Sequence, residues 1–275
     1  MLYITTAIYP EAAAVLKELP LKKTASRYGA IYTGPSAHLI VTGAGTVSAA
    51  LSVSEALTLS PPKEEDLLLN IGLCAAPEGT TTLGEAFFIH KITETATGRD
   101  YYPDMMFSSA YPEASLMTVP TICKSPVCLT DMEASAVYQA GRAFFSPDRM
   151  LFYKIVSDFG VSNGESEETF TPDKLTALLT PHIKPILTET SAYASTLTGE
   201  ELLSEDELSL TRELLLRIDA SATMEAELRQ LVRYLRYRDG DVTEPLRAFL
   251  LHYPEPVHRK EGKVILEAFR KYCLT

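Results

Sequence analysis

A hydrophobic stretch at residues 150–156, MLFYKIV, constrains the fold of this chain most, because it ends directly on Ser157 and Asp158. Such a stretch is typical of a strand buried on both faces of a sheet. It follows an amphipathic segment that opens on Asp131 and Glu133 and predicts a helix. An acid in the first turn of a helix and another beyond a buried strand stand where α/β sheets bind ligands. The sequence therefore predicts an α/β protein whose acids face a ligand.

Each of these acids also has a purely structural interpretation. Thr130 and Glu133 have the spacing of a capping box, in which Glu133 would only bond the backbone amide of the cap residue. Asp131 would suit the positive end of the helix dipole. Asp158 alone would pass for a loop residue behind a strand. A functional role is favoured by the pairing of the acids and by a third acid near the amino terminus.

That third acid, Glu11, lies at the turn between a predicted strand, residues 2–8, and a predicted helix, residues 11–19. Pro10 precedes it, and proline is favoured in the first turn of a helix. An acid at this turn gains from the free helix amides, which is a sufficient structural explanation. The alternative, in which Glu11 acts on a ligand, stays open.

The stretch DMEASAV at residues 131–137 is followed by KIVSD at residues 154–158. Both resemble motifs of the purine nucleoside phosphorylase and uridine phosphorylase superfamily, M-E-A-x-A-[IV] and a strand ending in I-S-D. They are most similar to its nucleosidase branch, which cleaves methylthioadenosine and S-adenosylhomocysteine. That branch has a basic residue where Lys154 stands. The resemblance covers about residues 1–197 and implies a homodimer.

The resemblance also implies a role for each acid. Breaking the bond between C1′ and the base leaves positive charge on the sugar and negative charge on the base, so an acid and a nucleophile are needed. Asp158 would protonate the leaving purine, and Glu11 would activate water on the other side of C1′. Glu133 would accept hydrogen bonds from the ribose hydroxyls, while Met132 packs on the sugar.

By the same resemblance, further residues are candidates for substrate binding, namely Gly45, Cys74, Ala75, Ser157 and Tyr102. Gly45 belongs to a T-G-x-G turn that borders the nucleophile's pocket in the superfamily. Cys74 and Ala75 stand in the place of a glycine-rich turn beside the base. Tyr102 lies in an aromatic loop, which favours either a pocket rim or a subunit contact.

Three functions remain open from the sequence. The first is a nucleosidase that hydrolyses the N-ribosidic bond of a purine nucleoside or thionucleoside, which the position of Glu11 favours. The second is a phosphorylase, which uses phosphate in place of water and needs cations, with Arg27 and Arg99 as the only plausible donors. The third is a non-catalytic nucleoside-binding module, suggested by the altered turn at residues 73–76 and the shortened segment at residues 116–129.

Composition argues against several partners. The net charge of −11 does not suit nucleic acid or anionic membranes, which require clustered cations. The amino terminus shows neither a signal peptide pattern nor a long apolar run. The four cysteines form no C-x-x-C pair and the five histidines are scattered, so we expect neither metal nor cofactor. We predict a cytoplasmic protein with reduced thiols.

The predicted fold is a three-layer α/β/α domain around a mixed, partly barrel-like sheet, residues 1–198, followed by an all-helical region, residues 199–275. A helix that begins at about Pro172 should be broken or kinked at Pro181 and Pro185. Helical periodicity in the tail predicts four helices, at residues 205–218, 223–237, 244–251 and 259–272.

Overall fold

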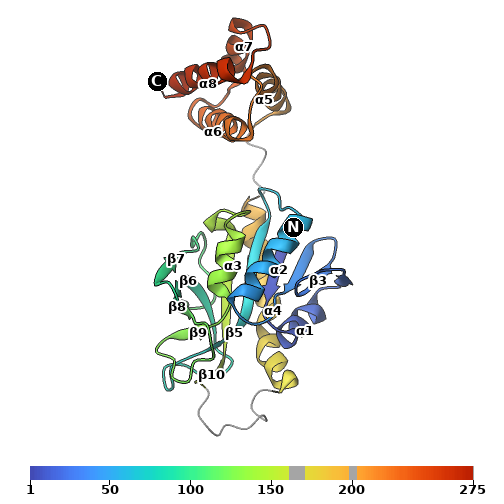
Figure 1. Ribbon diagram of the computed structural model, residues 1–275, viewed down its shortest axis with the longest axis vertical. Coiled ribbons are helices and arrows are strands. Elements are labelled where there is room, and N and C mark those ends of the chain that lie inside the picture. The colour runs from blue at the N-terminus through green and yellow to red at the C-terminus, as the bar shows by residue number, and fades with distance from the viewer. Residues whose placement is uncertain (161–170, 198–202, 275) are drawn as a thin grey trace. The chain divides into compact units, whose positions relative to one another are not determined.

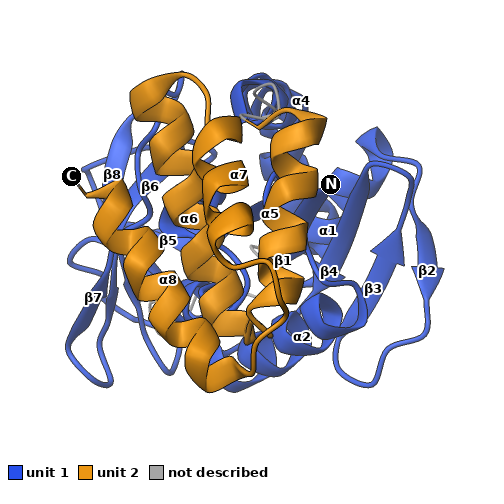
Figure 2. Ribbon diagram, turned by 90° about the horizontal axis from the view of Figure 1, so that it is seen from above, with its two compact units in different colours: residues 1–197 blue, residues 198–275 orange. Residues whose placement is uncertain are grey.

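The computed structural model describes residues 1–160, 171–197 and 203–274. The chain divides into two compact units, unit 1 (Met1–Leu197) and unit 2 (Thr198–Thr275), which Figure 2 colours separately. The predicted boundary between residues 198 and 199 falls in a segment, residues 198–202, that lies outside the described residues. Each unit has its own hydrophobic core.

One mixed sheet forms the centre of unit 1 (Figure 1). Its strands in chain order are β1 (Leu2–Thr6), β2 (Lys22–Thr24), β3 (Ala30–Thr33), β4 (Ala37–Val41), β5 (Leu67–Ala75), β6 (Ala86–Glu94), β7 (Arg99–Tyr101), β8 (Glu113–Thr118), β9 (Leu129–Asp131) and β10 (Met150–Asp158).

Strand β5 connects two parts of this sheet. On one side it pairs in parallel with β1, and β4, β3 and β2 follow as an open wing. On the other side it pairs with both β10 and β9, and β6 and β8 complete a closed circuit of five strands. The predicted mixed, partly barrel-like sheet is therefore confirmed. Because β1, β5 and β10 run parallel, their carboxyl ends meet at one edge.

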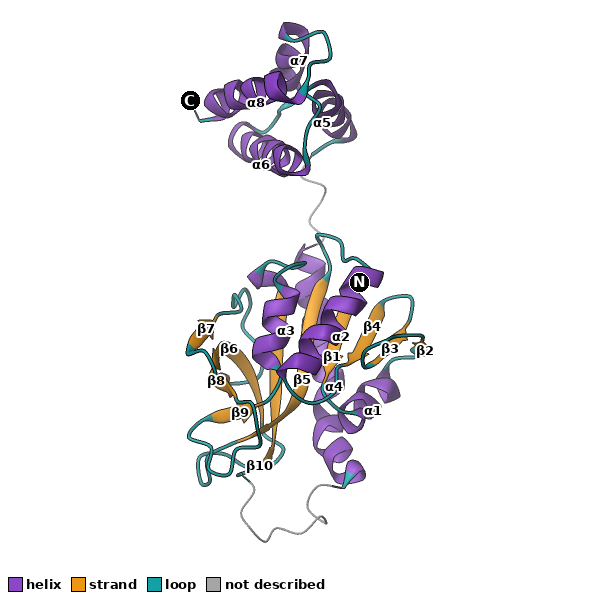
Figure 3. Ribbon diagram, in the orientation of Figure 1, coloured by secondary structure: helices purple, strands orange, loops and turns teal. Residues whose placement is uncertain are grey.

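Helices cover both faces of the sheet, as Figure 3 shows. Val53 of α2 packs in one cluster with Phe152 of β10, while Val15 of α1 packs in the opposite cluster with Leu151. The neighbours Leu151 and Phe152 point to opposite faces because side chains alternate along a strand. The helices of unit 1 are α1 (Tyr9–Glu18), α2 (Thr46–Leu59), α3 (Ala134–Gly141) and α4 (Pro172–Leu197), with a short 3₁₀ turn, η1 (Pro147–Arg149).

The sequence predicts that Pro181 and Pro185 break or kink the helix that begins at Pro172, and no break occurs. Helix α4 is continuous although Pro181 and Pro185 lie inside it. Each proline removes a backbone donor from the helix. Buried side chains on its apolar face, including Leu179 and Ile183, pack against the sheet together with α1 and hold the helix in place. Tertiary packing here overrides the local preference.

Unit 2 consists of helices only in its described part. Ser204 and Glu207 form a capping box at the start of the first helix, and Gly240 ends the second in the left-handed region at φ 79°. The helices are α5 (Glu205–Arg217), α6 (Ala222–Asp239), α7 (Thr243–His252) and α8 (Arg259–Cys273). All four predicted tail helices are confirmed. None of the helices among the described residues has the length and apolar character to cross a membrane.

Candidate active site

A cavity of about 280 Å³ opens at the edge of unit 1 where β1, β5 and β10 end. Its volume is at the small end of the range for small-molecule sites. Glu11, Glu133 and Asp158 all line it, although they come from the front, the middle and the latter part of the unit. The topology therefore brings together the three acids that the sequence singled out.

Glu11 is 2% exposed, and backbone amides bind both of its oxygens. Oε2 accepts hydrogen bonds from the amides of Ala7 (2.6 Å) and Ile8 (3.0 Å), and Oε1 accepts one from Leu73 of β5 (2.7 Å). Burial raises its pKa, and the Leu73 amide and the charge of Lys154 oppose that shift. A carboxylate offers about four acceptor positions, so one remains on Oε1 for a molecule in the cavity.

The segment before α3 differs from the prediction. Asp131 belongs to β9, and the helix begins at Ala134, so Glu133 is the cap residue itself. Its side chain makes no capping bond. Oε1 of Glu133 instead accepts a hydrogen bond of 2.7 Å from the amide of Gly45, at the start of α2. The structural alternative, a capping box with Thr130, does not form, because the carboxylate binds a distant turn.

Burial sets the charge state of Glu133. The residue is 8% exposed, and desolvation raises its pKa to about 7. The nearby charge of Asp131 adds to this shift, whereas Lys154 and the Gly45 amide oppose it. Near neutral pH, Glu133 is therefore present in both its neutral and its ionised form.

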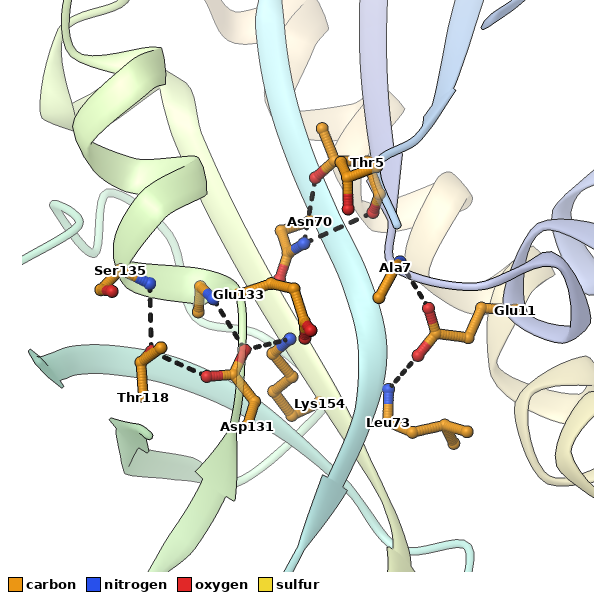
Figure 4. A network of polar contacts seen from close by, with 12 residues as sticks. Thr5, Ala7, Glu11, Asn70, Leu73, Thr118, Asp131, Glu133, Ser135 and Lys154 are labelled. Atoms are coloured by element: carbon orange, nitrogen blue, oxygen red, sulfur yellow. Dashed lines mark hydrogen bonds and ion pairs between the residues drawn. The ribbon is translucent and has the colours of Figure 1, made fainter. Parts of the chain in front are cut away.

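Sequence reasoning missed a buried ion pair at the cavity, between Lys154 and the lining residue Asp131 (Figure 4). Nζ of Lys154 is 2.8 Å from Oδ2 of Asp131, and the two side chains are 2% and 0% exposed. Asp131 also accepts hydrogen bonds from the Thr118 hydroxyl (2.7 Å) and the Ala134 amide (2.8 Å). A lysine inside a hydrophobic strand was the available signal, because a buried charge needs a partner.

Asp158 ends β10 and is half-buried at the cavity. Oδ2 accepts a hydrogen bond of 2.7 Å from the Ser157 hydroxyl, and Oδ1 accepts one of 2.9 Å from the Gly160 amide. The Ser157 hydroxyl also lies 3.2 Å from the carbonyl oxygen of Cys74. Ser157 thus has an alternative acceptor, which leaves Oδ2 of Asp158 available to a ligand.

No family model matches the chain, and no curated protein matches it. Solved structures of methylthioadenosine/S-adenosylhomocysteine nucleosidases do. The nucleosidase of Colwellia psychrerythraea is 15% identical, with a TM-score of 0.55 over 70% of this chain and 94% of that one. The S. pneumoniae nucleosidase is 17% identical, with a TM-score of 0.53 over 67% and 99%. The Arabidopsis thaliana nucleosidase is 18% identical, with a TM-score of 0.54 over 73% and 96%. This chain has the nucleosidase fold.

Within the nucleosidase fold, most of the other predicted binding residues also line the cavity, namely Cys74, Ala75, Met132 and Ser157. Gly45 contributes its amide to Glu133. Tyr102 is 53% exposed and is not among the lining residues of the described chain. Instead its ring lies 5.9 Å from Nζ of Lys91.

The cavity also has an apolar lining that sequence reasoning did not identify. Val119 and Ile122 come from the segment after β8, Ile8 from the start of α1 and Leu175 from α4. These residues carry no sequence signal of their own, because their place depends on how distant elements pack. They give the acids an environment of low polarity, which strengthens electrostatic interactions.

Proposed function

We propose that unit 1 is a nucleosidase that hydrolyses the N-ribosidic bond of a purine nucleoside or thionucleoside. The observation that carries this proposal is the meeting of Glu11, Glu133 and Asp158 at one cavity of about 280 Å³. Cleavage of this bond requires an acid for the base, a base for water and an acceptor for the sugar. Three carboxylates around one cavity supply these groups.

In the proposed reaction the bond between C1′ and the base nitrogen breaks while a bond from water oxygen to C1′ forms. Asp158 gives a proton to the leaving purine, and Glu11 takes a proton from the attacking water. General acid or base help of this kind contributes about 10²–10⁴ in rate. The free acceptor position on Oε1 of Glu11 supports its role, because its other positions are held by backbone amides.

Glu133 and Met132 would hold the ribose. The Gly45 amide occupies Oε1 of Glu133 and leaves its other oxygen for the sugar hydroxyls. The ionised carboxylate suits both hydroxyls best, because protonation turns part of its acceptor capacity into a donor. Met132 lines the same cavity beside Glu133 and would pack on the apolar face of the sugar.

Water is favoured over phosphate as the second substrate. Among the described residues that line the cavity there is no lysine or arginine. Arg27 and Arg99, the candidate phosphate ligands, are exposed and do not belong to its lining. The Gly45 amide, which would suit an anion at the start of α2, already binds Glu133. A phosphate dianion beside the four carboxyl groups that line the cavity, those of the three acids above and of Asp131, would be repelled.

A purine is the base we favour, because the Colwellia nucleosidase was solved with adenine and the S. pneumoniae enzyme with the transition-state inhibitor MT-ImmA.

We also propose a homodimer. Tyr102 is exposed and outside the cavity of its own chain, so it would serve as a subunit contact. Sedimentation of the full chain tests this second point.

The function is tested by measuring free base released from methylthioadenosine, S-adenosylhomocysteine, adenosine and inosine, with and without phosphate. We expect release of base and free sugar at the same rate in both conditions. Release only with phosphate, with a sugar phosphate as product, would identify a phosphorylase. Tight binding without turnover would identify a nucleoside-binding module.

A further inference from the structure

The proposed reaction makes no use of the buried pair of Lys154 and Asp131, yet this pair lies beside two of its acids. The ammonium group has three donors, and one of them points to Oδ2 of Asp131 at 2.8 Å. Asp131 is itself fixed by Thr118 and Ala134. The carboxylate of Asp131, itself held by two hydrogen bonds, therefore holds the ammonium in place.

Gly72 lies beside both this ammonium group and the Glu11 carboxylate. A Cβ atom at residue 72 would lie 3.1 Å from Nζ of Lys154 and 3.3 Å from Oε1 of Glu11. Gly72 pairs with Lys154 in the register of β5 and β10, so both face the same side of the sheet. Because the glycine has no side chain, this position leaves room for both the ammonium and the carboxylate. The charge of Lys154 acts on Glu11 across it.

The charges around Lys154 come from three elements: Glu11 of α1, Asp131 of β9 and Glu133 at the start of α3. Cys74 of β5 also lies within range of the ammonium, but its buried thiol is neutral because burial raises its pKa far above the usual range. One cation thus faces three carboxyl groups. Lys154 lowers the pKa of both Glu11 and Glu133, whereas Asp131 raises that of Glu133.

We propose that Lys154 is a positioning residue for the hydrolysis proposed above, because its ammonium, anchored by Asp131, keeps the buried Glu11 carboxylate ionised and ready to take a proton from water. Glu11 is almost fully removed from solvent, and burial alone favours its neutral, inactive form. This inference rests on the proposed function and adds the group that controls its base.

A merely structural role for Lys154 would be to neutralise Asp131. The double substitution Asp131→Asn with Lys154→Met separates the two roles, because it removes both charges of the ion pair together and leaves neither Asp131 nor Lys154 charged without the other. Loss of the Asp131 charge lowers the pKa of Glu133 and loss of the Lys154 charge raises it, so the two effects offset each other. Glu11 loses the cation, which opposes the effect of burial on its pKa. The double variant therefore changes mainly the base.

The measurement is kcat at saturating methylthioadenosine, or the best substrate of the panel, from pH 5 to pH 9. At saturation the pH profile reports groups in the substrate complex, where Glu133 is already bound to ribose. We expect the acid limb of kcat to move up by about two pH units in the double variant. On that limb kcat should then fall about 100-fold, with a KM change of less than about threefold.

A matched control is the double variant Asp148→Asn with Arg149→Met, which removes another ion pair of unit 1, 3.0 Å long. We expect its kcat and pH profile to match the unmodified chain. A folded Asp131→Asn/Lys154→Met protein with full kcat and an unmoved acid limb would overturn the positioning role and leave the hydrolysis intact. Failure of the unmodified chain to release base would instead refute the proposed function.

If the double variant does not fold, Gly72→Ala tests the same claim without removing a charge. The added methyl group would lie at the two short distances given above, so Nζ of Lys154 or Oε1 of Glu11 would have to shift. We expect a folded protein with kcat reduced about tenfold and an acid limb moved upward. An unmoved acid limb in a folded Gly72→Ala protein contradicts the proposal.

Discussion

Two buried glutamates, one in each unit, resemble each other in burial and in their backbone hydrogen bonds, but we propose a catalytic role for only one of them. Glu207 of unit 2 is 1% exposed and accepts hydrogen bonds from the amides of Ser204 (2.6 Å) and Val242 (3.0 Å). Glu11 of unit 1 is 2% exposed and accepts three backbone amides. Each one joins the start of a helix to a second element. Burial and backbone hydrogen bonds therefore do not distinguish a candidate catalytic acid from a structural one.

What distinguishes them is what lies beside the carboxylate. Glu11 lines a cavity together with Glu133 and Asp158, and a buried ammonium lies close to it. The neighbour of Glu207 is Arg236, at 3.7 Å, in a core of helices. A buried acid becomes a functional candidate when it faces a ligand-sized space and shares it with other ionisable groups. The following experiments test this distinction.

The largest effect is expected from Asp158→Asn. The amide keeps the shape of the side chain but has no acidic proton for the leaving base, so we expect kcat to fall about 10²–10⁴-fold. Base release under substrate saturation measures the loss, and an unchanged melting temperature shows that the fold is intact. Unchanged turnover would mean that Asp158 is an ordinary loop residue, as its simplest sequence interpretation held.

The substitution Glu207→Gln should lower stability without affecting turnover. Glutamine has one acceptor oxygen, so the amide of Ser204 or of Val242 loses its buried partner, at a cost of about 1–3 kcal/mol. Denaturant unfolding of the full chain measures this loss. The same substitution at Glu11 makes the matched comparison, since it should abolish most of the turnover. If Glu207→Gln stopped base release as well, the distinction between the two acids would fail.

The pH dependence of KM tests the third acid. The pKa of Glu133 is raised from 4.5 to about 7, and the proposed binding of the sugar uses its ionised form. Between pH 8 and pH 6 the ionised fraction falls about tenfold, so we expect KM to rise about tenfold. Glu133→Gln should raise KM and make it independent of pH in this range. A flat KM in the unmodified chain would exclude Glu133 from ribose binding.

The same group affects stability with a defined sign. Between pH 4.5 and pH 7 the folded state holds a proton on Glu133 that the unfolded state has released. Stability rises with pH only where the unfolded state binds more protons, so Glu133 makes the free energy of unfolding fall as pH rises through this window. Unfolding the unmodified chain and Glu133→Gln at pH 5 and pH 8 isolates this contribution. The opposite sign would contradict the raised pKa.

Local patterns predicted the elements well, because hydrophobic periodicity reports burial within a helix or strand. The ends of β1, β5 and β10 also placed the acids, since parallel strands present their carboxyl ends at one edge. The continuity of α4 past its prolines has a tertiary cause. Leu179 and Ile183 flank Pro181 in the sequence and are buried against the sheet with α1, a contact that a local rule does not contain.

The contacts that organise the site were not predictable, because they join positions far apart in sequence. The Gly45 amide and Glu133 are 88 residues apart, and the Leu73 amide and Glu11 are 62 apart. The capping-box spacing indicates only that Glu133 lies near the start of a helix, and the structure places Glu133 directly before α3. The donor that binds the carboxylate is set by how distant strands pair in the sheet, and the spacing of neighbouring residues does not reveal that pairing.

The smallest effect concerns two ion pairs with the same distance. Arg229 and Glu225, on α6 of unit 2, are 2.8 Å apart with side chains 39% and 47% exposed. Lys154 and Asp131 are also 2.8 Å apart, but 2% and 0% exposed. Water and salt screen the first pair, so Arg229→Ala should cost about 0.3–0.5 kcal/mol, and less in 1 M salt.

Removing one partner of the buried pair by Lys154→Met alone should cost about 3–5 kcal/mol, because Asp131 would remain charged without a partner. Denaturant unfolding of the two single variants at low and high salt measures both values. Equal costs would show that distance controls these pairs. Unequal costs, with salt affecting only the Arg229 variant, would show that burial controls the strength of these pairs. The larger cost for Lys154→Met would then mean that Asp131 holds Lys154 more strongly than Glu225 holds Arg229.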